Sequence, residues 1–149
     1  MSQTGSKTGF WGCLLAFSLV SQASCIGMNN DASDQPSHSN PVLLEQGQPW
    51  RLTTLAGQSV QVQPPITMSF SREGRINGYG GCNQYFGIFT ASPDGTLTIG
   101  QVGATKKFCL EQMELEQRFF QALASVTRFT IDADQLRLSG PAGNLEFEQ

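Results

Sequence analysis

Residues 66–71, Ile-Thr-Met-Ser-Phe-Ser, alternate apolar and polar side chains without interruption. Because successive side chains of a β-strand point to opposite faces, this pattern predicts a strand with one buried face. Turn signals follow at short intervals, with Arg72-Glu-Gly-Arg75 first and Ser92-Pro-Asp-Gly95 later. A chain organised in this way is expected to form hairpins, and therefore an antiparallel sheet.

Further short segments rich in apolar and aromatic residues extend this sheet. They are residues 50–55, 76–79, 84–90, 96–99, 128–131, 135–138 and 144–147. No strand–helix–strand repetition is visible, so a parallel sheet is not expected. We predict an α+β domain. It would be a small curved antiparallel β-sheet, or partly closed barrel, of about seven to nine strands with one helix packed on it.

The helix is predicted over residues 111–126, which lie before the last three strands. Its apolar stripe consists of Leu115, Phe119, Ala122, Leu123 and Val126. Acidic residues at 111, 114 and 116 fall in the first turns, where the helix dipole favours negative charge. We expect these three carboxylates to be solvated surface groups.

The first 25 residues have the organisation of a secretory signal peptide. Lys7 is their only charged residue, and it precedes the apolar run at residues 10–20. This run is too short to span a bilayer as a helix, and small residues follow it. Ala23-Ser-Cys25 resembles the end of a bacterial lipobox, which predicts acylation of Cys25. The alternative is ordinary cleavage after residue 23 without acylation.

Export has two consequences for the rest of the chain. The protein is expected in the bacterial cell envelope, membrane-anchored and facing the periplasm, or soluble in the periplasm if Cys25 is not lipidated. Residues 29–40 are polar and lack a periodic apolar face. We therefore predict a flexible tether over residues 26–48 and a folded domain over residues 49–149.

The composition excludes several classes of function. A formal net charge of −3, with charged residues at 14%, gives no electrostatic footprint for nucleic acid. The only histidine, His38, falls in the predicted tether, so histidine-based catalytic arrangements are not expected in the domain. Cys82 and Cys109 alone do not make a zinc site. We predict no catalytic residues, no metal and no cofactor.

Cys82 and Cys109 are the two cysteines of the predicted domain. The exported context is oxidising, so they are candidates for a disulfide. In the loop-entropy model, such a bond would stabilise the fold by about 3.5 kcal/mol. Two alternatives stay open: a pair of buried thiols, or a redox-active Cys109 beside Lys106 and Lys107.

Several motifs come in the order found in the META/HslJ-like domain family, which the chain resembles from Pro49 to Phe147. They are Trp50-Arg-Leu, Ile66-Thr-Met-Ser-Phe, Gly74-Arg-Ile-Asn-Gly78, Gly81-Cys-Asn-Gln-Tyr-Phe-Gly87, Ala104-Thr-Lys-Lys-Phe-Cys109, Glu116 with Phe119-Phe120 and Leu123, and Leu136-Arg-Leu138. The combination is specific, although each piece alone would be weak. The resemblance implies that Gly81, Asn83 and Thr105 have structural roles. We also expect Asn83 to clasp the bend that contains it.

The resemblance implies a non-enzymatic envelope protein. Members of this family have been linked to heat or envelope stress and to novobiocin resistance, so contacts with proteins or the envelope are expected. The alternative is a small apolar-ligand or lipid-binding module similar to secretin-pilot proteins. Its pocket could be lined by the aromatic side chains at 79, 85, 86, 89, 119 and 120, although these rings are also suited to forming the core.

Overall fold

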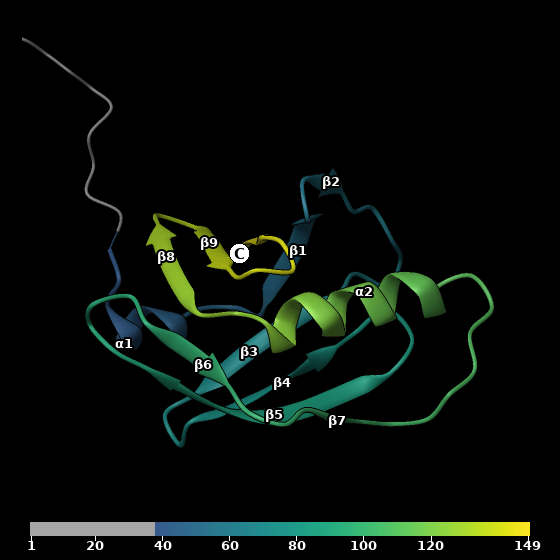
Figure 1. The fold of residues 1–149 in the computed structure, drawn as a ribbon, viewed down its shortest axis with the longest axis horizontal. Coiled ribbons are helices and arrows are strands. Elements are labelled where there is room, and N and C mark those ends of the chain that lie inside the picture. The colour runs from purple at the N-terminus through teal and green to yellow at the C-terminus, as the bar shows by residue number, and fades with distance from the viewer. Residues whose placement is uncertain (1–37) are drawn as a thin grey trace, which may run out of the picture. The chain divides into compact units, whose positions relative to one another are not determined.

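Hairpins dominate the fold of residues 38–149, the part of the chain that the computed structural model describes (Figure 1). The predicted signal peptide, Cys25 and residues 26–37 of the predicted tether lie outside the described residues.

Eight strands follow one another in the antiparallel order β6-β5-β4-β3-β1-β10-β9-β8. Their bounds are β1 Trp50–Leu55, β3 Thr67–Ser71, β4 Arg75–Tyr79, β5 Gln84–Ala91, β6 Leu97–Ile99, β8 Arg128–Asp132, β9 Gln135–Ser139 and β10 Leu145–Glu148. Two shorter strands were not predicted: β2, Gln58–Ser59, pairs with β1, and β7, Gly103–Ala104, pairs with β5.

The two ends of this order approach each other and nearly close the sheet into a barrel. Thr96 and Arg128 form an isolated antiparallel bridge between the chain before β6 and the first residue of β8. Beside it, the Leu97 N–H donates to the Thr127 carbonyl at 3.0 Å, and the Phe129 N–H donates to the Gly95 carbonyl at 2.9 Å. The predicted α+β fold with a partly closed antiparallel barrel is confirmed.

The turn predicted at residues 92–95 connects β5 to β6 and is held by Asp94. Its Oδ1 accepts the Thr96 N–H at 3.0 Å, and its Oδ2 accepts the Thr96 hydroxyl at 3.0 Å. The backbone hydrogen bond from Thr96, followed by the side-chain one, lowers the pKa of Asp94.

The barrel interior is filled by the apolar faces that the sequence patterns predict. Ile66, Met68 and Phe70 are all buried, as their alternation requires. Helix α2, Met113–Ala124, adds the buried side chains of Phe119 and Leu123. It is shorter at both ends than predicted.

Aromatic rings join α2 to the inner face of the sheet. The ring centroids of Tyr85 and Phe119 lie 5.6 Å apart, and those of Tyr85 and Phe120 lie 5.5 Å apart, both in edge-on geometry. Such pairs stabilise a core beyond the area that they bury. These rings, together with the buried Phe89, therefore form core rather than the lining of an open pocket.

The predicted tether over residues 26–48 is wrong in its second half, because residues 38–48 belong to the fold. His38 exchanges backbone hydrogen bonds with Ile131 of β8, at 2.9 and 3.0 Å. A short helix, α1 at Pro41–Leu44, buries Leu44 fully, and the Trp50 indole N–H donates to the Leu44 carbonyl at 3.2 Å. The polar residues before Pro41 led to the tether prediction, which overlooked the burial of Leu44.

Candidate functional site

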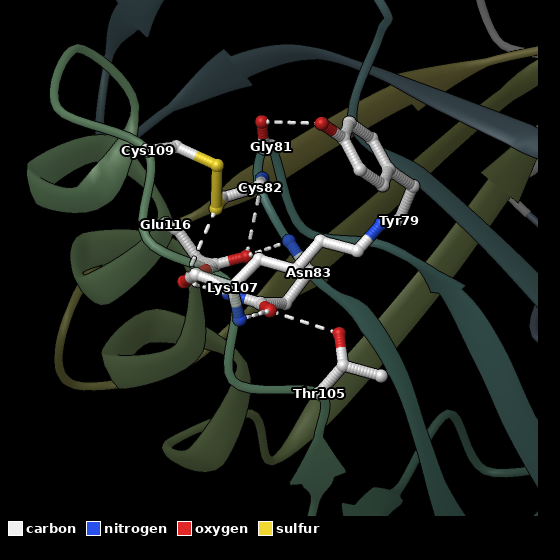
Figure 2. The surroundings of a disulfide bond; sticks show 8 residues. All are labelled: Tyr79, Gly81, Cys82, Asn83, Thr105, Lys107, Cys109 and Glu116. Atoms are coloured by element: carbon white, nitrogen blue, oxygen red, sulfur yellow. Dashed lines mark hydrogen bonds between the residues drawn. A yellow bond between two sulfur atoms is a disulfide. The ribbon is translucent and has the colours of Figure 1, made fainter.

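The family-signature residues meet at one end of α2, where two loops are fastened together. One loop joins β4 to β5 and contains Cys82. The other runs from β7 to α2 and contains Cys109. The two cysteines form a disulfide with a Cα–Cα separation of 5.9 Å, which is the pairing favoured by the sequence analysis (Figure 2). The alternative of two free thiols does not describe this structure.

Asn83 uses its side-chain amide to hold the second loop. Its Oδ1 accepts the Thr105 hydroxyl at 2.8 Å and the Lys107 backbone N–H at 2.7 Å. Its Nδ2 donates to Glu116 Oε2 at 2.8 Å and lies 3.4 Å from the Lys107 carbonyl oxygen (Figure 2). Asn83 was expected to clasp its own bend, but its side chain joins that bend to a distant loop and to α2.

Glu116 is the central acceptor of this network, and its side chain is buried, with 8% of the residue exposed. Its Oε1 accepts the backbone N–H groups of Cys82 at 3.2 Å and Asn83 at 2.6 Å. None of the salt bridges within residues 38–149 includes Glu116. Its carboxylate is therefore satisfied by N–H donors, which bind a carboxylate strongly in a site shielded from water.

The expectation that Glu116 is a solvated surface group is wrong. The sequence did contain a signal for its burial, because Glu116, Phe119 and Leu123 are spaced i, i+3 and i+7 on one helix face. Helix-dipole reasoning alone did not distinguish it from Glu114, which is exposed.

The glycines of the first loop allow its tight course. Gly81 has φ +112°, in the region that favours glycine, and its carbonyl accepts the Tyr79 hydroxyl at 2.7 Å. Gly78 lies against the Thr67 carbonyl, where a Cβ atom would overlap the backbone. The Tyr85 hydroxyl donates to the same carbonyl at 2.8 Å, and burial raises the pKa of Tyr85.

The predicted site residues are thus brought together, except one. Gly81, Cys82, Asn83, Thr105 and Cys109 all belong to the fastened loops (Figure 2). Cys25 lies outside the described residues. Lys107 and Glu116 complete the network through contacts that the sequence analysis did not predict.

The side chains of this arrangement hold the two loops and α2 together, and we call the Cys82–Cys109 disulfide with the Asn83 and Glu116 hydrogen bonds the clasp. Within residues 38–149, no group of three or more histidine, cysteine or acidic side chains is placed to hold a metal ion. The helices of the same region include none that is long and apolar enough to cross a membrane. The amide and carboxylate atoms of Asn83 and Glu116 are directed at backbone groups and at each other, so they fix the loops in place.

Comparisons with known proteins agree with this fold. The family model of the META domain matches residues 43–149. An NMR structure of a protein from Burkholderia xenovorans has a TM-score of 0.60 at 27% identity, covering 78% of this chain and 92% of that one. A second NMR structure has a TM-score of 0.60 at 24% identity, covering 73% of this chain and 93% of the other. No curated protein matches. The chain belongs to the META domain family.

Proposed function

We propose that this META domain is a non-enzymatic component of the bacterial cell envelope that supports tolerance of envelope stress through contacts with proteins or the envelope. The observation that carries this proposal is that the polar signature residues form hydrogen bonds with other groups of the domain itself. Glu116 accepts three N–H groups from Cys82 and Asn83, and Asn83 binds Thr105 and Lys107. Polar side chains engaged in this way serve to build a rigid surface.

Membrane attachment through Cys25 is the second part of the proposal. Thirteen residue steps separate Cys25 from His38, where the described fold begins. Even fully extended, a chain of this length reaches at most about 45 Å. An acyl group on Cys25 would therefore keep the domain close to the membrane surface on the periplasmic side.

Intact mass spectrometry of the mature protein tests export, acylation and the disulfide together. We expect a chain that begins at Cys25 and carries an acyl mass, with a further shift on reduction of Cys82–Cys109. A chain that retains residues 1–24 would contradict the proposed export. A mature chain without the acyl mass would restrict the proposal to a soluble periplasmic protein.

Deletion and complementation test the role in stress tolerance. A deletion strain should become sensitive to heat or to a hydrophobic antibiotic, and the wild-type gene should restore growth. Cys25→Ser should restore less than wild type if anchoring matters, while Cys13→Ser, which changes the removed segment, serves as its matched control. Unchanged growth of the deletion strain under several envelope stresses would contradict the proposed role.

A groove on the outside of the sheet favours a second candidate function, the binding of a small apolar ligand. It has a volume of about 540 Å³ and is lined by Ile76, Phe86, Ile88 and the polar Arg75, Asn77 and Gln101. Phe86 and Ile88 are each 64% exposed, although both are large and apolar. Titration with an apolar fluorescent probe should show binding that Phe86→Ser weakens. Equal binding by wild type and Phe86→Ser would contradict a ligand site here.

A further inference from the structure

The loop between β7 and α2 carries the two most exposed large hydrophobic side chains among residues 38–149. Phe108 is 74% exposed and Leu110 is 84% exposed. Met113, at the start of α2, follows at 43%. Three apolar side chains within six positions therefore face solvent on the surface beside the disulfide. Apolar side chains that cluster in this way mark interaction sites more often than single exposed ones do.

The signature network keeps these side chains turned outward. Immediately before Phe108, the Lys107 N–H donates to Asn83 Oδ1 at 2.7 Å. Immediately after it, Cys109 is bonded covalently to Cys82. Leu110 follows Cys109 directly, and the Met113 N–H donates to the Cys109 carbonyl at 3.2 Å. The backbone is thus held on both sides of Phe108, and in this arrangement Phe108 and Leu110 face solvent.

Positive charge lies immediately before these apolar residues. Lys106 and Lys107 are both exposed. The salt bridges within residues 38–149 involve Arg72, Arg75 and Arg137, and neither lysine. Glu111 and Glu114 follow only after Leu110, toward the helix, where the N-terminal dipole of α2 favours negative charge. Two cations followed by an aromatic and an aliphatic side chain suit an anionic membrane surface.

We propose that residues 106–113 form a membrane-docking loop. Phe108 and Leu110 enter the interfacial region of an anionic phospholipid bilayer, and Lys106 and Lys107 bind the headgroup phosphates. The charge pattern favours a bilayer over a protein partner, because lysine is depleted in protein–protein interfaces but attracts anionic lipid. The inference rests on the proposed envelope location, since anchoring at Cys25 would hold the loop within reach of a membrane.

Vesicle co-sedimentation of residues 25–149 carrying Cys25→Ser isolates the contribution of the loop, because this chain has neither the apolar run at residues 10–20 nor a thiol for acylation at position 25. We expect binding to phosphatidylcholine vesicles that contain phosphatidylglycerol, and much weaker binding to phosphatidylcholine alone. Lys106→Gln and Lys107→Gln should each weaken binding roughly fivefold. Phe108→Ser with Leu110→Ser should weaken it roughly tenfold or more. Added salt should reduce binding through screening of the lysines.

The matched control is Val42→Ser, which removes an exposed apolar side chain from α1, away from both the loop and the groove on β5. This variant should bind vesicles like its parent. Equal loss in the control and in the loop variant would overturn the proposal, because general hydrophobicity would then explain binding. Absence of binding to anionic vesicles would also overturn it. Concentration-dependent dimerisation that Phe108→Ser abolishes, without vesicle binding, would assign the loop to self-association instead.

These outcomes are distinguishable from failure of the proposed envelope function. The mass of the mature chain reports export and acylation. The loop substitutions lie at residues 106–110, so they leave the cleavage and acylation site at Cys25 unchanged. A correctly processed, acylated protein whose Cys25→Ser form ignores anionic vesicles would therefore contradict the docking loop alone.

Discussion

Glu116 and Asn83 are joined by two hydrogen bonds across a sequence separation of 33 residues. Glu116 Oε1 accepts the Asn83 backbone N–H at 2.6 Å, and Oε2 accepts Asn83 Nδ2 at 2.8 Å. The pair connects α2 to the loop between β4 and β5. The disulfide joins the same loop to the segment before α2, so the helix and this loop are held by both covalent and polar links.

Replacement of Glu116 by glutamine should destabilise the fold. The carboxylate uses both oxygens as acceptors, whereas an amide has only one and would direct its NH₂ group at a donor. We expect a loss of about 1–3 kcal/mol in the free energy of unfolding, measured by urea denaturation. Glu114→Gln, an exposed change on the same helix, is the control. Equal stability of the two variants would contradict the assigned role of Glu116.

Loss of the disulfide should lower stability without abolishing the fold. Cys82→Ala with Cys109→Ala releases a 27-residue cross-link, which costs about 3.5 kcal/mol in the loop-entropy model. Urea denaturation of wild type with reductant should match that of the double variant. Reductant should leave the double variant unchanged. A wild-type transition that is insensitive to complete reduction would argue against this contribution.

Gly78→Ala should be strongly destabilising. A Cβ atom there would overlap the carbonyl of Thr67 and lie 2.9 Å from the Tyr85 hydroxyl oxygen. Backbone atoms cannot rotate aside, so β3 and β4 would have to separate, at a cost of about 3 kcal/mol. Gly87→Ala on β5, whose nearest contact would be the movable Val102 side chain at 3.3 Å, should cost much less. Similar melting temperatures for the two variants would refute this explanation.

The turn held by Asp94 should contribute stability that depends on pH. Its folded-state pKa is lowered by hydrogen bonds from Thr96, so the ionised form is favoured in the folded state. The contribution is fully present above the unfolded pKa of about 3.9 and is lost as pH falls through the folded value. Asp94→Asn should therefore be less stable than wild type at neutral pH, and this difference should shrink in acid. Urea midpoints across a pH series would show it. A difference that widens in acid would contradict the assignment.

The strands could be predicted because their evidence is local. Alternation at residues 66–71 places Ile66, Met68 and Phe70 on one face in any antiparallel sheet, and the structure buries all three. The short strands β2 and β7 have no such pattern. Gln58–Ser59 and Gly103–Ala104 are strands only because β1 and β5 lie beside them and offer free hydrogen-bonding groups.

The contacts of the site were less predictable. Asn83, Thr105 and the two cysteines were singled out from motifs, but the partner of Asn83 on α2 was not. The spacing of Glu116 with Phe119 and Leu123 distinguishes it from Glu114, but its contact with Asn83 depends on how the helix lies against the loops. His38 was likewise assigned to a tether, although its backbone pairs with Ile131.

The sequence by itself determined the antiparallel class and the position of the main helix, because periodicity and turn chemistry act within a few residues of each other. The tertiary structure decided which groups the buried carboxylate binds, where the fold begins and how Phe108 and Leu110 come to face outward. Each of these depends on contacts between segments distant in the chain. Glu116 reaches Asn83, Cys109 bonds Cys82, and Leu44 is buried in the core. No local pattern specifies which distant partner a side chain will meet.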